Sequence, residues 1–106
     1  MNTFLISFSI LASLVSSNAP KYDIEEVLSW LEWCEARNNP FMINRFESHG
    51  SSYGLYQFRL STLYHFAERY GIKRQDPLDP EFQRTVARAM IEDGRMEQNW
   101  SVCSKL

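Results

Sequence analysis

The apolar residues of this chain form one continuous run near the start, followed by segments with helical spacing. The run from Phe4 to Val15 contains no charged residue and is about as long as the apolar part of a signal peptide. It is shorter than the roughly 20 residues that a membrane-spanning helix needs. We therefore predict that residues 1–19 are a signal peptide or, if uncleaved, a membrane anchor. A helix buried in the fold is the third alternative.

The first segment with helical spacing begins soon after this leader. Asp23 is followed three residues later by Glu26, which is similar to a capping box at the start of a helix. Apolar residues then recur at helical spacing, which predicts a helix over residues 24–36. The sequence Asn38-Asn39-Pro40 is expected to end it, because proline disfavours helical geometry in the residue before it.

Two more helices are predicted further along the chain. Ser61 is expected to cap a helix that runs to Tyr70, where Gly71 ends it. Asp79 is expected to cap a longer helix, because a proline stands at its first position and an apolar face follows. Gly94 marks the end of that helix, and a short terminal segment follows.

Between the first and second helices the pattern is less regular. Residues 41–52 are rich in polar and turn-forming residues and predict a loop, whereas residues 53–58 are aromatic and predict a short strand or extended segment. The chain is therefore expected to be mainly α, with a long loop and a short β segment. Functional side chains are often carried on such loops.

Composition and charge exclude some classes of function. The chain has 106 residues, which is enough for one domain. Its 11 Lys and Arg residues and 13 Asp and Glu residues all lie beyond residue 19, and the net charge is −2. No positive excess is available to neutralise phosphates, so we expect no nucleic-acid binding. Residues 20–106 are predicted to form a very small globular domain, for which a covalent cross-link would be useful.

The two cysteines, Cys34 and Cys103, allow only one intramolecular pairing. If the chain is exported they can oxidise. The disulfide would close a loop of about 70 residues, which stabilises by roughly 4 kcal/mol in the chain-entropy model. The alternative is a pair of buried free thiols.

Most catalytic patterns are missing from the sequence. His49 and His65 are not in a ligand-spaced cluster with cysteine, no Gly-rich phosphate loop is present, and no serine stands in a nucleophile elbow. We therefore expect no metal and no cofactor. Carboxylates remain, and Glu35 lies at the end of an apolar-faced helix, where partial desolvation would raise the pKa of a carboxyl group. A protonated carboxyl is what glycosidic bond cleavage requires, although a solvated surface charge is the simpler interpretation.

The order of several motifs adds to this interpretation. The segments are EARNNP at residues 35–40, GLYQ at 54–57, Thr62, and LDPE at 78–81. Together they resemble the lysozyme-like transglycosylase family, which includes soluble lytic transglycosylases and goose-type lysozymes. The resemblance covers roughly residues 24–93. It implies a small lysozyme-like domain over residues 20–106 that cleaves peptidoglycan glycan strands.

The resemblance also implies a mechanism. A single carboxyl, Glu35, would act first as general acid and then as general base, as in lytic transglycosylases. A lysozyme-type hydrolase would need a second carboxylate to direct water, and Glu47 in the predicted loop is the candidate for that role. Glu47 is also a competing candidate for the acid, but no Asn-Pro pair follows it.

Four residues around the GLYQ segment are candidate substrate contacts. Gly54 would let the backbone approach a sugar, because it has no side chain. Gln57 and Tyr53 would bind sugar hydroxyl or acetamido groups, and Tyr56 would stack on a sugar face. Core packing is the alternative for Tyr56.

Two other classes of function remain open. Ala36 stands where the family usually has serine, and no segment similar to the family's Ala-Tyr-Asn-Ala-Gly follows, which favours a non-catalytic secreted module that binds glycan or a partner protein. A small helical toxin or inhibitor is the third class. For the enzyme we expect a monomer that is secreted or held in the cell envelope. Its partner is peptidoglycan, and it contacts a membrane only if the leader is uncleaved.

Overall fold

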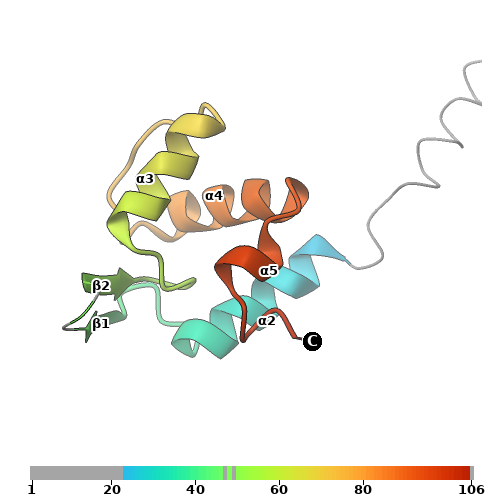
Figure 1. The fold of residues 1–106 in the computed structure, drawn as a ribbon, viewed down its shortest axis with the longest axis horizontal. Coiled ribbons are helices and arrows are strands. Elements are labelled where there is room, and N and C mark those ends of the chain that lie inside the picture. Colours follow the sequence, from blue (N-terminus) through green and yellow to red (C-terminus); the bar gives the residue numbers. More distant parts are fainter. Residues whose placement is uncertain (1–22, 47, 49, 106) are drawn as a thin grey trace, which may run out of the picture.

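Helices make up about half of the part of the chain that the structure, a computed structural model, describes: residues 23–46, 48 and 50–105. The elements, shown in Figure 1, are α2 (Ile24–Ala36), β1 (Ile43–Phe46), β2 (Gly50–Tyr53), α3 (Leu60–Arg69), α4 (Pro80–Glu92) and α5 (Met96–Asn99). These elements agree with the prediction of a mainly α chain, but the two strands lie mostly in the segment that was predicted to be a loop. The leader predicted over residues 1–19 lies outside the described residues.

Helix α2 has the predicted boundaries, and both of its ends are capped. The Asp23 carboxylate accepts a hydrogen bond of 2.9 Å from the backbone N–H of Glu25. At the other end Arg37 turns the chain out of the helix with a φ of 52°. Its guanidinium donates to the carbonyls of Trp33 and Cys34, at 2.8 and 2.9 Å. Arg37 therefore satisfies carbonyls that the end of a helix leaves unpaired.

The predicted loop over residues 41–52 is wrong in part, because most of it forms a β-hairpin. Strands β1 and β2 pair antiparallel, with Asn44 opposite Ser52 and Phe46 opposite Gly50. The strand predicted over residues 53–58 is a turn instead. Its ends, Tyr53 and Phe58, exchange backbone hydrogen bonds of 2.8 and 3.0 Å and so bracket the four residues between them.

The predicted N-terminal cap is confirmed for α4 and is wrong for α3. The Asp79 side chain accepts from the backbone N–H of Phe82 at 3.2 Å, and a proline follows Asp79. Helix α3 begins at Leu60, so Ser61 lies inside it and is not its cap. Gly71 follows the end of α3 with a φ of 67°, which favours glycine.

Helix α4 lies between α2 and α3, and its buried face holds these elements together (Figure 1). The core residues are Val27, Leu28, Leu31, Leu55, Tyr56, Phe58, Leu63, Ala67, Phe82, Val86, Ala87, Met90, Ile91, Met96, Trp100 and Cys103. The residues between β2 and α3 thus belong to the core, and Trp100 fixes them by donating its indole N–H to the Tyr56 carbonyl at 2.9 Å.

The predicted disulfide between Cys34 and Cys103 is confirmed, with Cα atoms 5.9 Å apart. It ties the end of the chain to the last turn of α2. Trp30 adds a second tie on the same helix, because its indole N–H donates to the Cys103 carbonyl at 2.6 Å. Within the described ranges, no helix has the length and apolar character needed to cross a membrane.

Candidate active site

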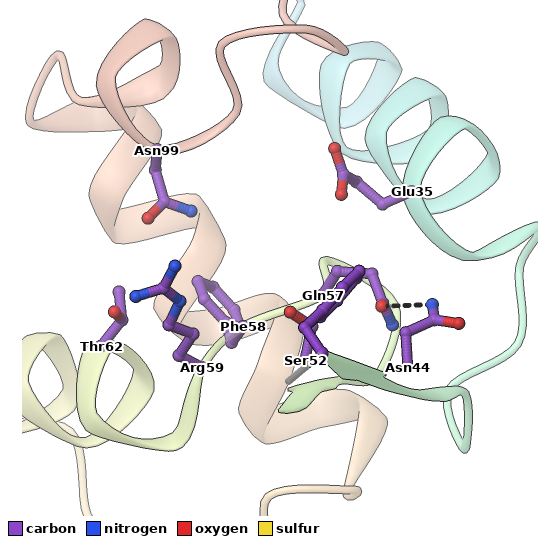
Figure 2. A pocket seen from close by; sticks show the side chains of 9 residues that line it. Glu35, Asn44, Ser52, Gln57, Phe58, Arg59, Thr62 and Asn99 are labelled. Atoms are coloured by element: carbon purple, nitrogen blue, oxygen red, sulfur yellow. Dashed lines mark hydrogen bonds between the residues drawn. The ribbon is translucent and has the colours of Figure 1, made fainter. Parts of the chain in front are cut away.

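A cavity of about 510 Å³ opens between the end of α2, the hairpin and the start of α3. Figure 2 shows Glu35 extending into it from α2, with Gln57 and Ser52 below, and Arg59, Thr62 and Asn99 on the opposite side. The lining residues are Glu35, Asn44, Phe46, Ser52, Gln57, Phe58, Arg59, Thr62 and Asn99. Two residues that the sequence nominated, Glu35 and Gln57, are therefore brought together across a separation of 22 positions.

Glu35 is partly buried at the cavity wall. It makes no hydrogen bond or ion pair with any residue in the described part of the chain. Burial raises the pKa of Glu35 above its ordinary value, because a low-dielectric environment disfavours the charged form. The carboxyl therefore holds its proton at a higher pH than a solvated glutamate does, as a general acid must.

The hairpin supplies one wall of the cavity through one of its faces. Asn44, Phe46 and Ser52 line the cavity, and successive side chains of a strand point to opposite faces of the sheet. Tyr53 pairs with Ile43 on the other face and does not line the cavity. The structure therefore does not bring Tyr53 into this cavity, and its contact with a sugar stays a prediction.

Gln57 lines the cavity, but its amide is already hydrogen-bonded within the protein. Its Oε1 accepts from Asn44 Nδ2 at 2.6 Å, and its Nε2 donates to the Gly54 carbonyl at 2.9 Å. An amide oxygen has two lone pairs, so one acceptor position stays available for a substrate. Gln57 also has a φ of 52°, a costly conformation for a residue other than glycine. The side-chain bonds hold it there beside Glu35.

Gln83, which the sequence analysis did not identify, connects the EARNNP segment to the GLYQ segment. It is fully buried on α4, accepts from the backbone N–H of Leu55 at 3.0 Å and donates to the carbonyl of Pro40 at 3.1 Å. A third bond, to the carbonyl of Pro77, measures 2.9 Å. Gln83 thereby joins the chain that leaves α2 to the turn that carries Gln57. The available signal was its position on the apolar stripe of α4, three residues before Val86.

Glycine is required at position 54 for a reason that differs from the expected one. Its φ is 78°, and a Cβ built there would lie 2.4 Å from Nε2 of Gln83. The glycine is buried, so it makes room for Gln83 and offers no open approach to a sugar. The expectation that Gly54 admits a sugar to the backbone is corrected accordingly.

Tyr56 is also corrected, because its ring is fully buried and cannot stack on a sugar. Its hydroxyl donates to Glu32 Oε2 at 2.5 Å, and the same carboxylate accepts from Arg84 Nε at 3.0 Å. Burial and then the Glu32 hydrogen bond raise the pKa of Tyr56 well above its usual range. This cluster connects the turn, α2 and α4.

Glu47, the proposed second carboxylate, lies outside the described residues, as does His49. Trp33 is stacked against Trp30, with ring centroids 5.6 Å apart, and lies apart from the cavity lining. Within the described ranges, no group of three or more His, Cys, Asp or Glu side chains is placed to hold a metal ion.

Comparison with known proteins identifies no relative: no family model, no curated protein and no solved structure matches this chain. The class that the fold and site define is therefore a small, disulfide-linked helical domain with a carboxyl-bearing cavity.

Proposed function

We propose that this chain cleaves the glycan strands of peptidoglycan by a lytic transglycosylase-type reaction, in a small lysozyme-like domain. The observation that carries the proposal is the environment of Glu35: a partly buried carboxyl with a raised pKa in a cavity that also contains Gln57. The spacing from Glu35 to the GLYQ segment, which resembles that of the family, supports the same proposal.

In the proposed reaction, the glycan lies in the cavity with the bond between N-acetylmuramic acid and N-acetylglucosamine next to Glu35. Protonated Glu35 gives its proton to the bridging oxygen as the bond from that oxygen to C1 of muramic acid breaks. The Glu35 carboxylate then takes the proton of the C6 hydroxyl, whose oxygen attacks C1. The product is a 1,6-anhydro sugar, the acid is regenerated, and no water is consumed.

Hydrolysis is the second candidate function. It needs a second carboxylate, for which the sequence offers Glu47. Such a carboxylate would direct water to C1 and leave a reducing end in place of the anhydro ring. In the described part of the lining, Glu35 is the only carboxylate.

Export of the chain is part of the proposal, because peptidoglycan lies outside the cytoplasmic membrane. The disulfide between Cys34 and Cys103 supports an oxidising compartment, since such bonds persist there and are rare in the cytosol. The charge-free run that begins at Phe4 supports delivery by a signal peptide.

The products formed from purified peptidoglycan test the proposal. Mass spectrometry of the released fragments is expected to show muramic acid ends that are one water lighter than reducing ends. The kcat/KM is expected to fall as pH rises through the raised pKa of Glu35, because the acid must be protonated. Reducing ends would establish the hydrolase instead. No release between about pH 4 and pH 8, the range over which carboxyl and histidine groups titrate, would refute both enzymes and leave the binding module.

A further inference from the structure

We propose that Arg59 binds a carboxylate on the muramic acid branch of the substrate and so makes the cavity selective for peptidoglycan over uncharged glycans. This inference rests on the proposed function, because it concerns the same cavity. It adds a specificity determinant that the family resemblance does not carry.

Arg59 stands at the start of α3 and lines the cavity. It is the N-cap residue by position, but its side chain makes no capping hydrogen bond. Figure 2 shows its side chain on the same side of the cavity as Thr62 and Asn99, across from Glu35. Thr62 and Asn99 give this side of the cavity a hydroxyl and an amide that can donate hydrogen bonds.

Arg59 has no carboxylate partner in the described part of the chain, unlike several other arginines. Arg84, Arg88 and Arg95 pair with carboxylates at 3.0, 2.6 and 2.7 Å. Among the described lining residues, Arg59 is the only cationic side chain. It forms no ion pair with Glu35, and the raised pKa of Glu35 agrees with that, because a close cation would favour the charged form.

An unpaired guanidinium in a cavity suits one substrate class in particular. Its planar fork matches a carboxylate and can form two parallel hydrogen bonds with it. Chitin and peptidoglycan share a β-1,4-linked backbone of acetamido sugars, and chitin has no acidic group. Every second sugar of peptidoglycan carries a lactyl group, which ends in a carboxylate or in a stem peptide that bears carboxylates. Arg59 can therefore distinguish the two polymers by charge.

Binding measured without cleavage tests this inference. On the Glu35→Gln background, calorimetry would measure how Arg59→Gln and Arg59→Lys change the binding of three soluble ligands of equal length. One is a peptide-bearing peptidoglycan fragment, one is the same glycan with its peptides removed and its lactyl carboxylates free, and one is a chitin oligosaccharide. The matched control is Arg45→Gln, which removes the same charge from an exposed position of β1 that does not line the cavity.

Arg59→Gln is expected to weaken binding of a carboxylate-bearing ligand about tenfold or more, with partial rescue by Arg59→Lys. Chitin binding and the Arg45→Gln variant should be unchanged. A loss confined to the peptide-bearing ligand assigns the stem peptide as the source of the carboxylate, and a loss with the peptide-free glycan assigns the lactyl group.

Equal losses for all three ligands, an equal effect of Arg45→Gln, or no effect of Arg59→Gln would overturn the inference. The proposed function would survive each of these if the wild-type chain still releases anhydro products. Conversely, Arg59-dependent binding by a chain that cleaves nothing would refute the enzyme and support this inference. If no saccharide binds and the wild-type chain releases no fragments, both are refuted.

Discussion

At the scale of single residues, the sequence placed Glu35 at the end of an apolar-faced helix and left two environments open, a partly desolvated carboxyl and a solvated surface charge. The structure agrees with the first, because burial raises the pKa of Glu35. Local periodicity was sufficient to place this residue. Gly54 and Gln83, which contact each other, are 29 positions apart in the chain, and no local pattern indicates this contact.

Replacing Glu35 by glutamine is expected to stabilise the protein in a pH-dependent way. The folded state holds the Glu35 proton more tightly than the unfolded state does, so wild-type stability falls as pH rises from the ordinary glutamate pKa through the raised one. Glutamine cannot ionise. In urea unfolding, the advantage of Glu35→Gln should therefore grow from acid to neutral pH, and a difference independent of pH would contradict the burial of this carboxyl.

Gly54→Ala is expected to lower the free energy of unfolding by roughly 2–4 kcal/mol, because it adds a positive-φ penalty to a clash with the buried Gln83 amide. Gly71→Ala is the matched control, with a φ of 67° and no atom within 4 Å of the added Cβ. It should cost about 1 kcal/mol. Equal costs in chemical denaturation would show that Gly54 is required only for its backbone conformation.

At the scale of elements, the helices were predictable and the hairpin was not. Capping residues and apolar stripes specify α2 and α4, and these signals are local. Strands β1 and β2 have four residues each and no buried position, so they lack the alternation that identifies a strand. Tertiary bonds hold the hairpin in place, among them the one from Asn44 to Gln57.

Tyr56→Phe tests how the turn is fixed against α2. The substitution keeps the buried ring but removes the hydrogen bond to Glu32, which bears charge and is largely buried. The expected cost in thermal or urea unfolding is about 2 kcal/mol. Tyr70→Phe, which removes a similar bond to Asp93 at the surface, should cost about 0.5 kcal/mol or less. Equal costs would mean that the buried cluster does not stabilise the turn.

At the scale of the whole molecule, the chain compensates for a small core by linking its C-terminal end to α2. The disulfide reaches Cys34, next to Glu35, so the cross-link and the candidate acid share one helical turn. The pairing was predictable because only two cysteines exist. The cavity as a whole was not, since its lining comes from α2, the hairpin, α3 and α5.

Removing the disulfide in a Cys34→Ser/Cys103→Ser variant is expected to lower the free energy of unfolding by roughly 4 kcal/mol, because the bond closes a long loop in the unfolded chain. Urea unfolding of the variant and of the wild type, each with and without reductant, would measure this. Reductant should lower only the wild-type stability. A wild type indifferent to reductant would contradict a stabilising role.

The central claim is that Glu35 supplies the proton for glycan cleavage, and release of soluble fragments from purified peptidoglycan tests it most directly. Wild-type protein is expected to release fragments with anhydro ends, and Glu35→Gln should be slower by about 10²–10⁴-fold while remaining folded. Glu68→Gln, an exposed glutamate on α3, is the matched control and should retain wild-type rates. Release by Glu35→Gln at the wild-type rate would contradict the account.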